Sequence, residues 1–321
     1  MCKMKTNKNL IIVWGDGGIC SQIGFYSVGL YLMNKGFDVK FDLNFFKNNA
    51  KDCIGRFDRN FDLQKAFPNI VVNEASLSEI KYYKKHYPKR HNNLSFFKPP
   101  LYLNGWAPIL PFLVQNRHFF IDNFQPVDVE TCHTFLSDIQ KHNSCGVHIR
   151  RGDLANSTEG VYGYPCSVNY FSTAINILSK LEKNIKFYFF SDEPEYVKKE
   201  ILPTLSKDIN YQLCDSNGSD KGYLDLYLLS KCRHIIASKG SFGAFARILS
   251  NSDGWFIGTL KSSYLAEYFD KCIFLNYDKE KFIKYEESFP KFYYYKKLKK
   301  LFINMLPIRS WRKKLRKKYH V

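Results

Sequence analysis

The chain has 321 residues, of which 45% are hydrophobic and 24% are charged, a composition that excludes a disordered or fibrous protein. The formal net charge is +18, but 12 basic residues and no acidic residue lie from Lys291 onward. The preceding residues therefore carry only about +6, which does not indicate a nucleic-acid partner and suits a domain that binds a phosphorylated ligand.

The first elements form a β-α-β pattern. An apolar strand is predicted at residues 10–14, followed by the glycine loop Gly15-Asp-Gly-Gly18 and by apolar residues at helical spacing up to residue 32. Gly36 is predicted to end that helix, and residues 39–43 alternate as a second strand. Residues 44–98 show poor periodicity and are predicted to be irregular with some helix. We place a domain boundary near Lys141.

The second half contains three predicted strands that each end in a polar or glycine-rich loop. They cover residues 145–149, 185–190 and 234–237, and a further strand is predicted at 211–214. Helices are predicted between them at 170–181, 195–202 and 223–232, and another after the last loop. Strands and helices that alternate in this way are typical of a parallel, doubly wound sheet. Ligands of such sheets bind at the carboxyl ends of the strands.

Two adjacent arginines, Arg150 and Arg151, follow the first of these strands. A guanidinium group binds phosphate oxygens as a two-pronged fork, so the pair suits a diphosphate. A solvated arginine pair bridged to Asp153 would give the same pattern. The residues alone leave both interpretations open.

Several motifs in this half resemble those of the α-1,2-fucosyltransferase family. His148-Ile-Arg-Arg-Gly-Asp153 matches the H-x-R-R-x-D signature of the fucosyltransferase superfamily. The further matches, in family order, are Phe190-Ser-Asp192, Asp225-Leu-Tyr-Leu-Leu-Ser-Lys-Cys-Arg-His234 and Ser241-Phe242, together with the looser Gly17-Gly-Ile-Cys-Ser-Gln-Ile-Gly24 and Leu103-Asn-Gly-Trp106 nearer the N-terminus. The resemblance extends over residues 11–258. It departs from the family where N-S-S-F-S-W-W reads Lys239-Gly-Ser-Phe-Gly-Ala-Phe245, and where Cys20-Ser21 replaces Gly-Asn.

The resemblance implies an α/β fold with two Rossmann-like lobes of the GT-B type. We expect an acceptor-side lobe at residues 1–140, a GDP-sugar-binding lobe at 141–275 and a basic helical tail at 276–321. The implied reaction is inverting transfer of L-fucose from GDP-L-fucose to a sugar hydroxyl, α-1,2 to a galactose-type residue, in surface polysaccharide synthesis and with no metal ion or other cofactor. Two alternatives are another GDP-deoxyhexose such as colitose, and a non-catalytic basic protein that binds glycan or nucleic acid.

The resemblance also implies roles for individual residues. Arg150 and Arg151 are expected to bind the diphosphate and to stabilise the departing GDP. His148 and Asp225 are expected at the guanine or ribose, although a core histidine and a charge at a helix N-terminus are equally simple explanations. The other expected donor contacts are Ser191, Asp192, Lys239, Gly240, Ser241, Phe242, Gly17, Gly18 and Gln22. The general base is expected among three carboxylates, Asp16, Asp153 and Glu159.

The basic tail alternates lysine and arginine clusters with apolar residues between 296 and 318 and is interrupted by Pro307. Such a pattern is typical of short amphipathic helices on an anionic bilayer, where a lipid-linked acceptor would lie. A helix packed on the first lobe with a ragged basic end would look the same. With no signal peptide, no apolar run of about 18 residues and nine scattered cysteines without a C-x-x-C pair, we expect a cytoplasmic protein with reduced thiols.

Overall fold

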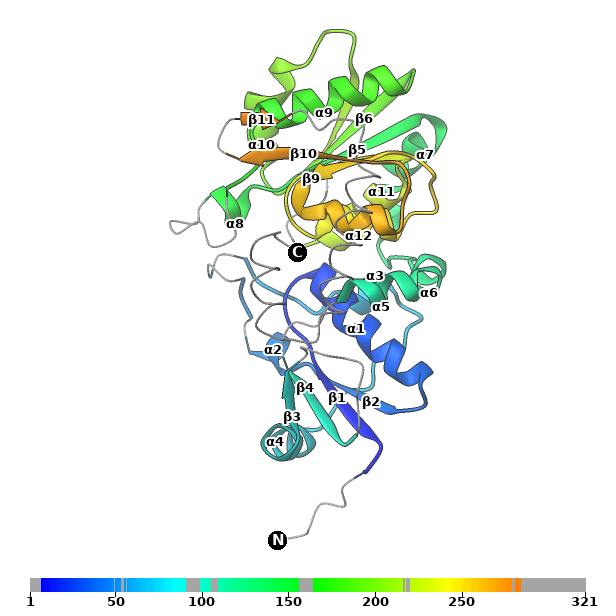
Figure 1. The fold of residues 1–321 in the computed structure, drawn as a ribbon, viewed down its shortest axis with the longest axis vertical. Helices are drawn as coiled ribbons and strands as arrows, with labels where there is room; N and C mark the ends of the chain where they lie inside the picture. Colours follow the sequence, from blue (N-terminus) through cyan, green and yellow to red (C-terminus); the bar gives the residue numbers. More distant parts are fainter. Residues whose placement is uncertain are drawn as a thin grey trace, which may run out of the picture.

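The computed structural model describes residues 7–48, 50–52, 55, 57–90, 99–104, 109–155, 164–215, 217, 220–278 and 281–283. Figure 1 shows two lobes stacked along the long axis of the molecule, with strands β1–β4 in one lobe and β5–β11 in the other. Each lobe is built on a sheet of mainly parallel strands accompanied by helices. The predicted α/β class with two Rossmann-like lobes is therefore confirmed.

The N-terminal lobe contains a four-stranded parallel sheet in the order β2-β1-β4-β3. Its strands are β1 (Leu10–Trp14), β2 (Asp38–Asp42), β3 (Pro88–Arg90) and β4 (Leu101–Asn104). Its helices are α1 (Ile19–Asn34), α2 (Asn44–Lys47), α3 (Leu63–Ala66), α4 (Leu77–His86), α5 (Ile109–Gln115) and α6 (Arg117–Asn123). Helix α1 ends as predicted, because Gly36 at φ 83° donates its N–H to the Met33 carbonyl.

The C-terminal lobe contains a seven-stranded sheet in the order β11-β10-β9-β8-β5-β6-β7, in which only β10 and β11 are antiparallel. Its strands are β5 (Asn143–Ile149), β6 (Ile185–Ser191), β7 (Asn210–Cys214), β8 (His234–Ala237), β9 (Phe256–Thr259), β10 (Cys272–Asp278) and β11 (Lys281–Ile283). Its α-helices are α7 (His133–Lys141), α8 (Gly152–Ala155), α9 (Val168–Leu181), α10 (Pro194–Tyr196), α11 (Gly222–Lys231) and α12 (Phe242–Ile248). Shorter turns are η2 (Val129–Cys132), η3 (Val197–Ile201), η4 (Leu202–Thr204) and η5 (Leu260–Glu267).

The C-terminal lobe begins earlier and ends later than the predicted limits of residues 141 and 275. Helix α7 packs against α11 and β5, so the chain enters the second lobe before residue 133, ahead of the predicted boundary at 140. Residues 276–278 and 281–283, expected in the helical tail, are instead strand and extend the sheet beyond residue 275. Hydrogen bonding to a neighbouring strand decides their conformation, and that pairing is not visible in the local pattern. The rest of the predicted tail, residues 284–321, lies outside the described residues.

The two lobes are joined by a shared apolar layer. One buried cluster runs from α1 and β1 through α11 and α12 to the near face of the larger sheet, and a second cluster fills the space between the opposite face and α9. Arg117 of α6 adds a polar tie, because its guanidinium donates to the backbone carbonyls of Ile248 (3.3 Å) and Ser250 (2.7 Å) at the end of α12. Helix α12 is therefore anchored from both lobes.

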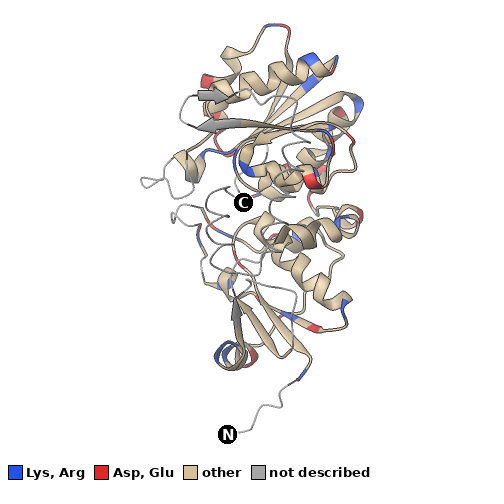
Figure 2. Ribbon diagram, viewed as in Figure 1, with Lys and Arg blue, Asp and Glu red and all other residues tan. Residues whose placement is uncertain are grey.

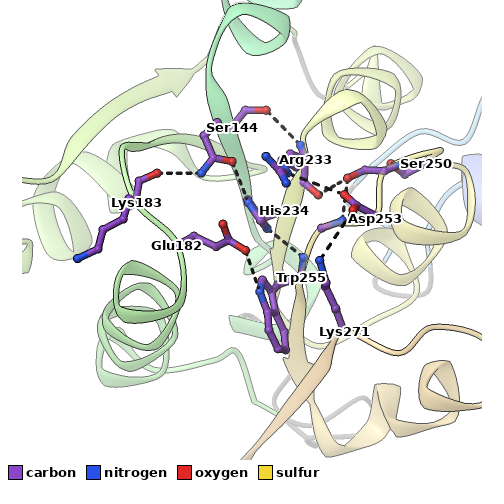
Figure 3. Close-up of polar contacts among 12 residues, drawn as sticks. Ser144, Glu182, Lys183, Arg233, His234, Ser250, Asp253, Trp255 and Lys271 are labelled. Atoms are coloured by element: carbon purple, nitrogen blue, oxygen red, sulfur yellow. Dashed lines mark hydrogen bonds and ion pairs between the residues drawn. The ribbon is translucent and has the colours of Figure 1, made fainter.

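A polar network closes the amino end of the larger sheet (Figure 3). The His234 Nε2 lies 3.0 Å from the Asn143 side-chain oxygen, and its Nδ1 accepts the Trp255 backbone N–H at 2.9 Å. The Trp255 indole N–H donates to Glu182 at 3.1 Å. Burial lowers the pKa of His234 to about 4, so the ring is neutral. This network occupies the end of the sheet opposite the carboxyl ends of β5 and β8.

In the described part of the chain, charged residues of both signs are mixed. Figure 2 shows acidic and basic residues interspersed along both lobes. No helix in the described ranges has the length and apolar content needed to cross a bilayer.

Candidate active site

The larger sheet has a switch point between β5 and β8. From β5 the chain continues to β6 and β7 on one side, and from β8 it continues to β9 and β10 on the other. The two strands are parallel neighbours, with His148 opposite Ala237. In α/β sheets, ligands bind outside the carboxyl ends of the strands at such a switch point. Arg150 follows β5 and Lys239 follows β8, so both leave the sheet at the switch point.

Arg150 is held at the switch point by the loop that follows β8. Its backbone N–H donates to the Ser238 hydroxyl at 2.9 Å, and the Ser238 N–H donates to the His148 carbonyl at 3.0 Å. Gly240 has φ 119°, and a Cβ at this residue would lie 2.7 Å from the Arg150 Nη1. Only glycine therefore combines this backbone conformation with so close a guanidinium.

His148 packs against the loop after β8 that holds Arg150. Its ring stacks on Phe242 with centroids 4.8 Å apart and planes 18° apart, and its Nδ1 lies 3.2 Å from the Ser238 hydroxyl. The residue is only 8% exposed. Burial, aided by the Arg150 charge, lowers the pKa of His148 to about 3, so the ring is neutral. A buried, neutral His148 that stacks on Phe242 favours a structural role for this histidine over a contact with the guanine or ribose.

Arg151 faces a different direction from Arg150. Its Nε donates to a Glu193 carboxylate oxygen at 3.0 Å, and its guanidinium carbon lies 3.4 Å from the centre of the Tyr196 ring. This combination of ion pair and cation–π contact satisfies the side chain within the protein. The two arginines of the motif therefore have different environments, and only Arg150 lies against the switch-point loop.

The turn after β6 braces this motif. Asp192 accepts the Arg151 backbone N–H at 2.9 Å and also that of Gly152, while the Ser191 hydroxyl accepts the Glu193 N–H at 3.0 Å. Burial raises the pKa of Asp192 above its ordinary value. Ser191 and Asp192 were expected to contact the donor. Ser191 holds the turn after β6 and Asp192 holds the turn after β5, and their contact with the donor stays a prediction.

Lys239 is accompanied by a lysine that the sequence did not reveal. Burial, followed by the neighbouring ammonium group of Lys261 and the charge of Arg150, lowers the pKa of Lys239. Lys261 is the second residue after β9, the next strand of the sheet. Lys261 could have been found from the sequence only if β9 had been predicted, because the pairing of β9 with β8 brings Lys261 near the end of β8.

Asp225 lies farther along the same edge. It occupies the first turn of α11, and its carboxylate accepts the Asn217 amide at 2.7 Å. Its charge acts on Cys214, the last residue of β7. Burial raises the pKa of Asp225 to about 7, so the carboxyl is partly protonated at neutral pH.

On the opposite lobe, Gln22 organises the glycine loop. This fully buried side chain donates its amide to the Gly17 carbonyl (3.1 Å) and the Asn60 carbonyl (2.7 Å). Its oxygen accepts the backbone N–H groups of Asp62 (2.8 Å) and Leu63 (2.9 Å). With every amide atom bonded to backbone, Gln22 offers nothing to a donor, so the expected contact is replaced by a structural role.

The first turn of α1, directly after the glycine loop, meets the loop that follows β8 across the lobes. The Cys20 thiol is in hydrogen-bonding contact with Ser241, and the Arg150 charge reaches it. Burial raises the pKa of this thiol to about 12. In the same turn of α1, the Ser21 hydroxyl donates to Asp16 of the glycine loop at 3.4 Å, and burial raises the pKa of Asp16 above its ordinary value. Asp16 therefore lies beside the turn of α1 that contacts the loop after β8.

Gly18, Asp153 and Glu159 were also expected at the site. Gly18 approaches Arg59, because a Cβ on Gly18 would lie 3.7 Å from the Arg59 Nη1. The side chain of Asp153 and the whole of Glu159 lie outside the described residues. Asp16 is therefore the one expected general base whose surroundings the described part of the chain defines.

The chain is similar to several known glycosyltransferases. Two relatives are from Escherichia coli: an α-1,2-colitosyltransferase, 26% identical over 76% of this chain and 89% of the relative, and the O-antigen biosynthesis glycosyltransferase WbnK, 24% identical over 37% and 41%. Among solved structures, fucosyltransferase NodZ from Bradyrhizobium covers 76% of this chain and 94% of its own with 14% identity and a TM-score of 0.43. POFUT1 in complex with GDP covers 76% and 96% with 11% identity and a TM-score of 0.42. The model of glycosyl transferase family 11 matches residues 79–276, well over half of the sequence, and the chain therefore belongs to this family of glycosyltransferases.

Proposed function

We propose that this glycosyltransferase moves a 6-deoxy-L-hexose from a GDP-linked donor to a sugar hydroxyl during synthesis of a surface polysaccharide. The observation that carries the proposal is the Arg150 guanidinium, held against Gly240 at the switch point of the larger sheet. A guanidinium fixed at this place suits the diphosphate of a nucleotide sugar. Lys239 adds a second cation beside it.

The spacing along the sheet edge supports a nucleotide. Asp225 acts on Cys214 at the end of β7, which lies two strands from β5. Two strand spacings amount to about 10 Å, comparable to the distance between the diphosphate and the base of GDP. A carboxylate is a suitable acceptor for the N1–H and N2–H donors of guanine. We therefore assign the guanine to the Asp225 end and the diphosphate to the Arg150 end.

The chemistry divides between the two lobes. As the bond between the sugar C1 and the diphosphate oxygen breaks, its electron pair passes to that oxygen, and Arg150 stabilises the developing charge. The acceptor oxygen attacks C1 from the opposite face and gives its proton to a base. We assign this role to Asp16, whose raised pKa brings it nearer to the working range of a general base. No divalent ion is required in this scheme, since the cationic residues supply the positive charge.

The donor sugar is L-fucose or colitose, which differ by one hydroxyl at C3. Family membership and the sequence motifs agree with fucose, whereas the α-1,2-colitosyltransferase relative favours colitose and a 1,2 linkage. The test supplies purified enzyme with GDP-L-fucose or GDP-L-colitose and a β-galactoside, in EDTA, and follows both GDP release and product linkage. We expect transfer from one donor and loss of transfer in Asp16→Asn. Failure with both donors, or strict dependence on a divalent ion, contradicts the proposal.

We further propose that residues 291–321 attach the enzyme to the inner face of the cytoplasmic membrane, near a lipid-linked acceptor. Their 12 basic residues are the support for this assignment. Deleting them should abolish sedimentation with anionic liposomes while donor hydrolysis persists, and salt should mimic the deletion. A truncated protein that is insoluble or inactive in hydrolysis would instead indicate that the tail packs on the enzyme.

A further inference from the structure

Three cationic residues follow three adjacent parallel strands of the larger sheet. In the β5–β8 ladder His148 pairs with Ala237, and in the β8–β9 ladder Ile236 pairs with Ile257. Arg150, Lys239 and Lys261 come two to four residues beyond these ladders. Because the strands are parallel, all three residues leave the sheet at the same edge.

The two lysines of this row follow neighbouring parallel strands, β8 and β9. The Lys261 ammonium group is near enough to lower the pKa of Lys239, and the Arg150 charge acts on Lys239 in the same direction. Among the described residues, neither Lys239 nor Lys261 forms an ion pair with a carboxylate, whereas Lys186 and Lys198 do. Like charges held so close repel one another, and an anion between them removes the repulsion.

We propose that Lys239 and Lys261 form a two-lysine clamp for the terminal phosphate of a diphosphate, with Arg150 on the inner side. The assignment rests on the proposed GDP-sugar donor and adds Lys261 as a binding residue. In that donor the terminal phosphate oxygen receives the electron pair of the broken C1–O bond. The clamp therefore touches the group on which charge increases most during the reaction.

The same chemistry would bind the diphosphate of a lipid-linked acceptor, so the experiment must separate the two sources. Calorimetry in EDTA compares GDP, GMP and inorganic pyrophosphate on wild type, Lys261→Met and Lys261→Arg. Lys271→Met is the matched control, since Lys271 lies 3.9 Å from Asp253 at the opposite end of the sheet (Figure 3). Thermal melts of each variant check folding, which an exposed lysine should not disturb.

We expect wild type to bind GDP more tightly than GMP, and Lys261→Met to weaken GDP by at least about tenfold with little change for GMP. Lys261→Arg should restore part of the preference, and Lys271→Met should keep all of it. If wild type binds neither nucleotide, the proposed donor is wrong. If Lys261→Met keeps the full GDP preference, the clamp is refuted while the donor stands. Loss of pyrophosphate binding alone would move the site to the acceptor and overturn our assignment.

Discussion

Replacing Gly240 by alanine should separate the position of Arg150 from the stability of the fold. At φ 119°, any L side chain is strained, which costs about 1–3 kcal/mol. The new Cβ would also lie 2.7 Å from the Arg150 Nη1, so the guanidinium must retreat by about 0.7 Å to reach the 3.4 Å of ordinary contact. A displacement approaching 1 Å in a catalytic group reduces turnover by about 100-fold.

The control for this substitution is Gly36→Ala. Gly36 also has a positive φ, 83°, but nothing lies within 4 Å of its added Cβ. Both variants should lose similar stability in chemical denaturation, while only Gly240→Ala loses donor turnover, measured as GDP release from the GDP-sugar. Equal turnover in the two variants at matched folded fraction would show that the placement of Arg150 over this loop does not matter for the reaction.

Two further predictions concern pH. The pKa of Asp225 is raised to about 7, so GDP affinity should increase about tenfold per pH unit as pH rises toward 7 and then level off, with protons released on binding. Calorimetry in buffers of different ionisation enthalpy measures this proton release. If the pH profile of Asp225→Asn is the same as that of wild type, Asp225 does not belong to the guanine site. The pKa of His234 falls from 6.5 to about 4 in the folded protein, so the unfolded chain binds more protons in this interval and stability should decrease as pH falls from about 6.5 to 4. In chemical denaturation, the free energy of unfolding of His234→Gln should be lower than that of wild type and should depend less on pH between about 4 and 6.5. The same pH dependence in both proteins would argue against a neutral His234 ring.

Much of the larger sheet was predictable because its central strands are buried on both faces. β5, β6 and β8 each read as a short apolar run that stops at a polar loop, and the structure places them where predicted. β9 was missed because Gly258 interrupts the apolar run of Phe256-Ile-Gly-Thr259, and glycine inside a short segment weakens a strand pattern. β11 depends on pairing with β10, which no local pattern reports.

The site was only partly predictable because residue type does not disclose a partner that is distant in sequence. Arg150 and Arg151 are equivalent in the motif, yet Arg151 pairs with Glu193, 42 residues away. Gln22 is similarly committed to Asn60 and the backbone that follows it, 38 residues and more away. Lys261 required the position of β9. Arg150 and Gly240 were identifiable because each lies in the loop that follows a predicted strand, where parallel sheets bind their ligands.

The most direct test of the account compares Arg150→Lys with Arg151→Lys in donor turnover. Lysine keeps the charge but loses the fork, so it should fail where a diphosphate is gripped and be tolerated better where an ion pair and an aromatic ring are the partners. We predict that Arg150→Lys lowers kcat/KM for the GDP-sugar by about 100-fold or more with little change in Tm. Arg151→Lys should mainly lower Tm, through its contacts with Glu193 and Tyr196. A kcat/KM for Arg150→Lys within a few-fold of wild type would contradict the assignment of the donor diphosphate to the switch point.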